Sequence, residues 1–243
     1  SQAAVTKRRK AAAAKALDSH LGWFQAREPA LRAAPNAALP LLHEVEGVTL
    51  LFDPPGRKGE APGVAEALLE LLRSAQRSVV IETPYLIPTR GLAEALAGAI
   101  HRGVAVRILT NSLATTDHIW VQAVYIGERQ QLVRLGIELW EYMGKESLHT
   151  KAVVIDDELA VVTSFNLDPR SERLNTELAV LVHDRGFAAE LLAAMATHLA
   201  SSARIDAEGM PVGYSERYPG VSCAQIWKLR LLSPLAWLIR GQL

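Results

Sequence analysis

The sequence predicts an α/β fold in which a mixed, mostly parallel sheet carries helices on both faces. Apolar, β-branched runs alternate with segments of helical apolar spacing from residue 48 to residue 142. Two further apolar runs, within residues 149–164, are joined by too few residues to form a crossover. Alternating strands and helices form parallel pairs, whereas such a short connection requires an antiparallel hairpin.

The first part of the pattern repeats a strand followed by a helix and closes with a strand. Its strands are short and apolar, and its helices carry apolar residues three and four positions apart, with Pro and Gly between elements. The expected strands are 48–52, 78–82, 104–110 and 137–142, and the expected helices are 64–75, 91–101 and 117–135.

The second part breaks this rhythm. Strands 149–155 and 159–164 are separated only by residues 156–158, so we expect a hairpin. A strand at 176–182 follows, and Asp184 is a good N-cap for a helix at 186–199.

Three regions are expected along the chain. Residues 1–44 comprise a basic, Ala-rich helix and an Ala/Pro-rich connector, without a strand pattern. Residues 45–205 hold the α/β domain, and residues 206–243 form an apolar and basic tail.

Composition limits the classes of protein. Of the 243 residues, 49% are hydrophobic and 21% charged, which indicates a globular chain. The 26 Lys and Arg balance the 26 Asp and Glu, so no overall field draws the chain to nucleic acid, which is not an expected partner. The single Cys223 excludes a disulfide framework within the chain. The chain has neither a signal-peptide pattern nor an apolar run long enough for a transmembrane helix.

The hairpin gathers polar side chains at one end. His149 and Lys151 are two residues apart on the expected strand, so they leave the same face, whereas Asp156 has the opposite parity and points elsewhere. Folding the hairpin brings Ser164 and Asn166 to the same end. Lysine is a poor metal ligand and no second ligand has suitable spacing, so we expect no metal site. The donors suit phosphoryl oxygens, and an imidazole can attack phosphorus or transfer a proton, so a phosphodiester is the expected substrate class.

These residues resemble the phospholipase D superfamily, whose signature is His-x-Lys, four residues, Asp, and then Gly-Ser-x-Asn. Thr163 stands where the signature has its glycine. The segments FNLDPRSERLNTE, ETPYLIPT and ILTNSL are similar to the bacterial cardiolipin synthase branch, and the resemblance covers about residues 45–205, with a similar tail. The matching residues here are His149-Thr150-Lys151, Asp156 and Thr163-Ser164-Phe165-Asn166.

The resemblance implies a role for each matching residue. His149 would be the nucleophile or the general acid, and Lys151 and Asn166 would clamp the phosphate with help from Ser164. Glu177 would be the carboxylate that fixes the tautomer of His149. Asp156 would be structural, and no metal or other cofactor is expected.

Two further residues have open roles. Tyr85 follows a strand and either lines the substrate cleft or only packs. Arg170 either contacts a lipid phosphate or forms a local salt bridge.

The implied mechanism requires two such motifs, because one histidine forms a phosphohistidine while the other protonates the leaving alcohol. This chain has one His-x-Lys. Either two chains meet as a homodimer, or the first motif lies in an upstream half of the same protein; Ser1 in place of Met and the connector-like opening favour the upstream half. The expected function is phosphodiester cleavage or phosphatidyl transfer on a phospholipid. The alternatives are a phosphate-binding half without independent catalysis and a dimeric nuclease of the same superfamily.

The tail predicts contact with a lipid surface. Residues 224–243 combine apolar and aromatic residues with basic ones, which is typical of interfacial segments, although packing against the domain is an equal alternative. We therefore expect a location at the periphery of the bacterial cell membrane. The residues concerned are Trp227, Leu231, Leu232 and Trp237, with Lys228, Arg230 and Arg240.

Overall fold

The computed structural model describes residues 29, 44–45, 47–54, 63–214, 218 and 221–243. The chain divides into two units, Ser1–Glu44 and Val45–Leu243, and the second is described below. The basic helix and connector expected in residues 1–44, like the loop at 55–62, fall on residues outside the described set.

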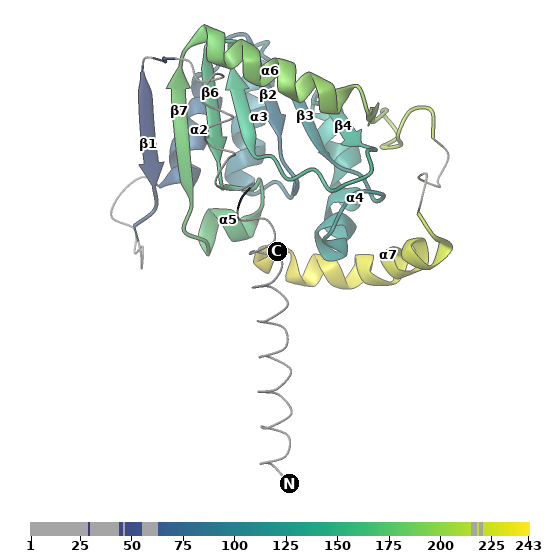
Figure 1. The fold of residues 1–243 in the computed structure, drawn as a ribbon. Helices are drawn as coiled ribbons and strands as arrows, with labels where there is room; N and C mark the ends of the chain where they lie inside the picture. The colour runs from purple at the N-terminus through teal and green to yellow at the C-terminus, as the bar shows by residue number, and fades with distance from the viewer. Residues whose placement is uncertain (1–28, 30–43, 46, 55–62, 215–217, 219–220) are drawn as a thin grey trace. The chain divides into compact units, whose positions relative to one another are not determined.

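The described residues form a mixed sheet of eight strands in the order β1-β7-β6-β5-β2-β3-β4-β8 (Figure 1). The mixed sheet is confirmed, but the expected predominance of parallel pairs is wrong. Within the described chain only β2–β3 and β3–β4 are parallel, because the hairpin and the edge strands all join antiparallel neighbours. The strands are β1 (Val48–Phe52), β2 (Ser78–Glu82), β3 (Ala105–Asn111), β4 (Glu138–Tyr142), β5 (Ala152–Ile155), β6 (Leu159–Thr163), β7 (Leu178–His183) and β8 (Ser202–Arg204).

Helices cover both faces of the sheet. α2, α3 and α4 pack on one face, α6 crosses the other, and α7 packs against α4 (Figure 1). None of the described helices is long and apolar enough to cross a membrane. The helices are α2 (Val64–Ser74), α3 (Arg90–His101), α4 (Ile119–Arg134), α5 (Pro169–Arg173), α6 (Arg185–Leu199), α7 (Cys223–Ala236) and the 3₁₀ helix η2 (Trp237–Gln242).

Local sequence signals explain where these elements begin. The predicted cap of α6 is confirmed, because Asp184 Oδ1 accepts a hydrogen bond from the Phe187 amide at 2.8 Å.

All four residues of β5 are buried, since Ala152 and Val154 pack on the α6 side while Val153 and Ile155 face the other core. A strand covered on both faces is apolar throughout, which is why β5 lacks polar alternation.

Asp156 fixes the turn of the β5–β6 hairpin. Asp156 and Asp157 have φ angles of 55° and 59°, a left-handed conformation that Asp tolerates better than most residues. The Asp156 carboxylate accepts from the backbone amides of Gln76, Arg77 and Ser78, at distances from 2.6 to 3.2 Å. Burial tends to raise the pKa of Asp156, but these donors and the Arg77 charge lower it more, so the net pKa is below the usual value.

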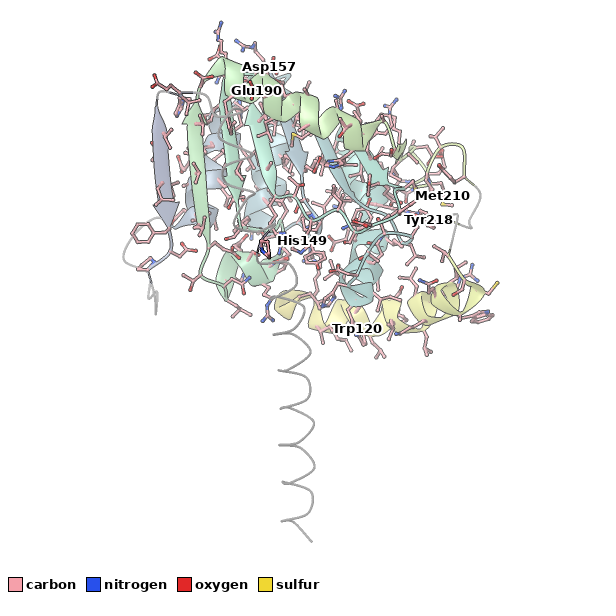
Figure 2. The ribbon with its side chains drawn as sticks, in the orientation of Figure 1. Trp120, His149, Asp157, Glu190, Met210 and Tyr218 are labelled. Atoms are coloured by element: carbon pink, nitrogen blue, oxygen red, sulfur yellow. The ribbon has the colours of Figure 1, made fainter. Side chains whose placement is uncertain are left out.

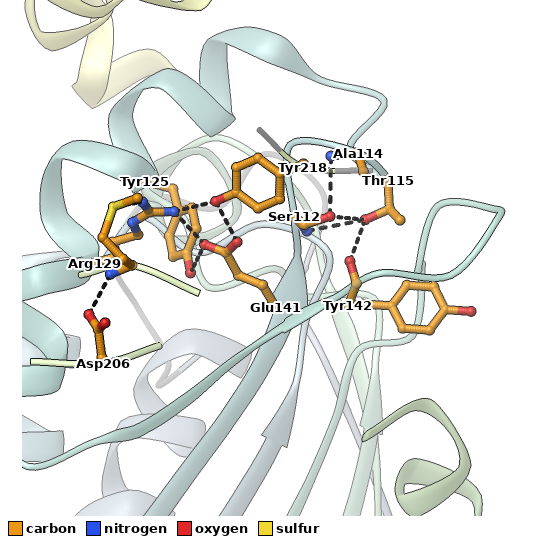
Figure 3. Close-up of polar contacts among 10 residues, drawn as sticks. Ser112, Ala114, Thr115, Tyr125, Arg129, Glu141, Tyr142, Asp206 and Tyr218 are labelled. Atoms are coloured by element: carbon orange, nitrogen blue, oxygen red, sulfur yellow. Dashed lines mark hydrogen bonds and ion pairs between the residues drawn. The ribbon is translucent and has the colours of Figure 1, made fainter. Parts of the chain in front are cut away.

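A buried polar network ties α4, β4 and the segment before α7 together (Figure 3). Glu141 accepts from Arg129 at 2.9 Å, from the Tyr125 hydroxyl at 3.0 Å and from the Tyr218 hydroxyl at 2.8 Å. The Glu141 side chain is fully buried, so each of these donors compensates for lost hydration. The network therefore anchors the chain that leads into α7.

We expect Glu141→Leu to lower the free energy of unfolding by about 3–5 kcal/mol, because it leaves the buried Arg129 guanidinium without a counter-charge. Urea denaturation measures the change. The double variant Glu141→Leu/Arg129→Leu should recover part of this loss. Equal stability of the single and double variants would contradict the argument.

We expect Asp156→Asn to destabilise the protein near neutral pH and to become harmless in acid. A carboxylate whose folded pKa is depressed contributes stability above its unfolded pKa of about 3.9, and this stability disappears as pH falls through the folded pKa. Urea denaturation across this pH range should show the wild-type and variant curves converging at low pH. The exposed neighbour provides the control Asp157→Asn, which should follow the wild type throughout.

Candidate active site

The site begins where the chain enters β5. His149 and Lys151 precede the first residue of that strand, so the expected strand start at His149 is wrong. The two side chains nevertheless converge: Lys151 Nζ lies 3.1 Å from His149 Nδ1 and donates to the His149 carbonyl at 2.9 Å. Figure 2 shows His149 at one end of the sheet and Asp157, in the hairpin turn, at the other. Asp156 is therefore kept from His149 by the length of β5.

Lys151 lies among carboxylates. Its partial burial lowers its pKa, while the negative charges of Glu177, Asp117 and Asp168 act in the opposite direction without cancelling the effect. These acids come from three separate segments of the chain, so the tertiary fold gathers them around one ammonium group.

Ser164 and Glu177 form a fixed pair beside the hairpin. Ser164 Oγ donates to one Glu177 carboxylate oxygen and accepts from the Leu178 amide at 3.1 Å. The other Glu177 oxygen accepts from Asn175 Nδ2 at 3.0 Å, and the Glu177 amide donates to Asp53 at 3.0 Å. Glu177 is 5% exposed, so its carboxylate has little freedom to reorient.

The expected hydrogen bond between Glu177 and His149 is not formed. Both Glu177 oxygens already accept hydrogen bonds from Ser164 and Asn175, and the His149 Nδ1 atom faces Lys151. In this arrangement Glu177 positions Ser164 instead of the imidazole.

Thr163 replaces a glycine without disturbing the hairpin. Its hydroxyl donates to the Leu178 carbonyl at 2.7 Å and accepts from the Phe165 amide at 3.0 Å. Its own amide donates to the Lys151 carbonyl at 3.0 Å. Thr163 therefore links β7 and the two motif segments.

Asn166 lines a pocket of about 250 Å³. Its Oδ1 atom is buried and has no hydrogen-bond partner, which is costly unless a ligand supplies one. The Arg170 amide, at the same pocket, donates to the Leu243 carbonyl at 3.0 Å, and the Arg170 side chain is exposed. The lining residues are Tyr85, His118, Val121, Asn166, Asp168, Arg170, Asn175 and Leu243.

Tyr85 joins the pocket to the histidine. Its ring stands perpendicular to that of His149, with centroids 6.3 Å apart, and its edge-on contact with His118 is 5.9 Å. The Tyr85 hydroxyl donates to Asp117 at 2.8 Å. Burial and the Asp117 carboxylate raise the pKa of Tyr85, so its phenol stays protonated and acts as a donor.

Several residues of this region lie outside the sequence motifs and meet the site only in the folded chain. Asp117 follows β3, and the carboxyl ends of parallel strands are where ligands bind, so that position was the available signal. Asp168 caps α5 by accepting from the Ser171 amide at 2.7 Å. Asn175 donates to Glu177, and His118 lines the pocket. In the described part of the chain, no group of three or more His, Cys, Asp or Glu side chains is arranged to hold a metal ion.

Comparison with known proteins finds a matching family model and similar curated proteins that both carry the name cardiolipin synthase. Residues 68–199 match the family described as "Cardiolipin synthase, PLD-like domain". Cardiolipin synthase A of Pseudomonas entomophila is 34% identical over 206 residues, which cover 85% of this chain and 41% of that protein. Cardiolipin synthase A of Erwinia tasmaniensis is 32% identical over 146 residues, 60% of this chain and 29% of that protein. The chain thus spans less than half the length of these curated relatives.

Two solved structures share the fold. Phosphatidylserine synthase of Haemophilus influenzae aligns with a TM-score of 0.58 at 18% identity, over 81% of this chain and 48% of that one. Nuc of Salmonella typhimurium, a phospholipase D family member, aligns with a TM-score of 0.53 at 20% identity, over 65% of this chain and 97% of that one. Because the family match covers more than half of the residues, the chain belongs to the phospholipase D superfamily, as a member with a cardiolipin synthase-like domain.

Proposed function

We propose that this chain is the half of a phospholipase D-type enzyme that contributes one histidine to phosphodiester cleavage or phosphatidyl transfer. The observation that carries the proposal is the pairing of His149 with the Lys151 ammonium, 3.1 Å away, next to the pocket that holds Asn166. A cation and an amide beside an imidazole suit a phosphodiester, whose charge they would offset as phosphorus is attacked. Cardiolipin synthase-like relatives point to a phospholipid as the substrate.

His149 would act through Nε2, because Lys151 faces Nδ1. In the imidazolium form this nitrogen would protonate the leaving oxygen, and in a neutral ring with an unprotonated Nε2 it would attack phosphorus. One of the two histidines would form the nitrogen–phosphorus bond as the phosphorus–oxygen bond breaks, while the other would give its proton to the leaving oxygen. Water or an alcohol would later attack phosphorus and release the first histidine.

The other proposed residues would hold the substrate. Lys151 and Asn166 would donate to the non-bridging phosphoryl oxygens, with the Asn166 amide rotated to present its NH₂ group. Ser164, which Glu177 orients, would assist them. Tyr85 would form a wall of the cleft, and the exposed Arg170 side chain would contact a lipid phosphate at the pocket rim.

An uncovered apolar face supports assembly with a second half. Phe52 on β1 lies opposite Leu178 on β7. In the next row of this face, Val180 on β7 lies between Leu50 on β1 and Val162 on β6. Four of these five side chains are at least 42% exposed, which is unusual for the face of a sheet. Ser164 follows β6 and Glu177 precedes β7, so this face adjoins the proposed site. A second copy of this chain or an upstream half of the same protein would cover it.

We expect a strictly monomeric sample of this chain to show little or no phosphodiesterase or phosphatidyl-transfer activity. Activity should appear on dimerisation, as turnover that rises steeply with protein concentration, or on restoring upstream residues of the natural gene. His149→Ala should abolish that activity, whereas His101→Ala, on the exposed surface of α3, should not. Radiolabelled phospholipid turnover measures both.

Chelation with EDTA tests whether the activity requires a metal ion. EDTA should leave activity intact, because Lys151 and Asn166 would offset the phosphoryl charge. Strong inhibition by EDTA, or full activity of the monomer, would contradict the two-histidine mechanism. If the monomer, the dimer and the chain with restored upstream residues all bind phosphate but none shows turnover, the result would support the binding-half alternative.

We expect activity to fall on the alkaline side at a pH below that at which an ordinary lysine loses its proton. The reason is that burial lowers the pKa of Lys151, and the neutral amine no longer attracts the phosphate. In Lys151→Arg the guanidinium stays protonated, so the alkaline limb should move to higher pH even if turnover falls. The exposed Lys145→Arg is the matched control, and an identical shift in it would remove Lys151 from the explanation.

A further inference from the structure

The C-terminal helical segment carries an apolar stripe on its outer side. We define the stripe as Trp227, Leu231, Leu235 and Leu238, whose exposed fractions are 70%, 74%, 51% and 71%. Their spacing of four, four and three residues places them on one helical face. The opposite side of α7 is buried against α4 through Leu229 and Ala236.

The structure thus corrects the surface expected from sequence. Leu232 is half-buried against the cluster between α4 and α7, so it belongs to the packed side. Leu235 and Leu238 take its place on the outer side. The side chain of Trp237 lies outside the described set.

The charge of this segment has one sign. Residues 218–243 contain Lys228, Arg230 and Arg240 but no Asp or Glu. Lys228 and Arg230 are exposed beside the stripe. Arg240 donates to Glu128 at 2.5 Å and to the Pro88 carbonyl at 2.6 Å. An apolar face that carries tryptophan next to basic residues is typical of helices that lie in the interface of an anionic bilayer.

The stripe is held in place and adjoins the candidate site. The Tyr218 hydroxyl fixes the chain before α7, and the Arg240 contacts fix η2. Beyond η2, the Leu243 carbonyl accepts from the Arg170 amide, and Leu243 lines the same pocket as Asn166. Figures 1 and 2 show α7 along the end of the sheet at which His149 lies. A surface that contacts the stripe therefore lies near the pocket.

We propose that the stripe docks this chain on an anionic phospholipid surface and thereby presents lipid phosphodiesters to the pocket. The second part rests on the proposed function, but docking itself requires no catalysis. Lipid fits better than a protein partner because the segment has basic but no acidic side chains and carries a row of exposed apolar side chains.

Vesicle cosedimentation of the 243-residue chain tests the docking. We compare vesicles of phosphatidylcholine alone with vesicles of phosphatidylcholine and phosphatidylglycerol. The wild type should prefer the anionic vesicles, and Leu231→Glu/Leu238→Glu should weaken partitioning about a hundredfold or more, because two apolar side chains no longer enter the interface. Val212→Glu is the matched control: Val212 is 56% exposed, lies outside the stripe and should bind as the wild type does.

Three further measurements are the unfolding temperature of the double variant, vesicle binding by His149→Ala, and self-association without lipid. They separate docking from a folding defect, from catalysis and from a protein interface. Circular dichroism should show the same unfolding temperature for the double variant and the wild type. If the double variant unfolds at a lower temperature, the single variant Leu231→Glu is used in its place. His149→Ala should bind vesicles normally, so loss of the proposed catalysis would leave docking unaffected. Equal vesicle binding by wild type and Leu231→Glu/Leu238→Glu would overturn the proposal. So would loss of self-association in this variant without lipid, since the stripe would then be a protein interface.

Discussion

The anchoring of the β5–β6 hairpin by Asp156 is the constraint on which the site depends. One carboxylate holds three backbone amides at the start of β2, and β5 then pairs antiparallel with β2 from Val79–Ile155 to Glu82–Ala152. Fixing one end of a paired strand also fixes the other end. Lys151 and His149 consequently emerge where β2 and β3 end, next to the loops that carry Tyr85 and Asp117.

Neighbouring elements complete the site through hydrogen bonds that leave few side chains free to move. Glu177 is held through its amide by Asp53 and through its carboxylate by Ser164 and Asn175. Asp168 is committed to the first turn of α5. His149, in contrast, is exposed, and the Asn166 amide oxygen has no partner. Rigid surroundings with a few unsatisfied groups are suited to binding a ligand without large rearrangement.

The same fold connects the site to the C-terminal helix. Glu141 on β4 receives hydrogen bonds from two residues of α4 and from Tyr218, so the core of the sheet determines where α7 begins. Arg240 and Leu243 then attach the end of the chain to α4 and α5 segments near the pocket. Because both ends are attached, the outer face of α7 keeps a fixed orientation relative to the site.

The sequence by itself determined the features that depend on local spacing. These are the hairpin, the cap at Asp184, the order of strands and helices from β1 to α6 apart from the short α5, and the convergence of His149 with Lys151, since period and turn chemistry act over a few residues. Only the tertiary structure decided which distant groups meet. Tyr85 and Asp117 are 32 residues apart, Glu177 bonds Ser164 instead of His149, and Leu232 packs inward while Leu235 faces outward. Those outcomes depend on long-range strand pairing and helix packing, which the local pattern does not encode.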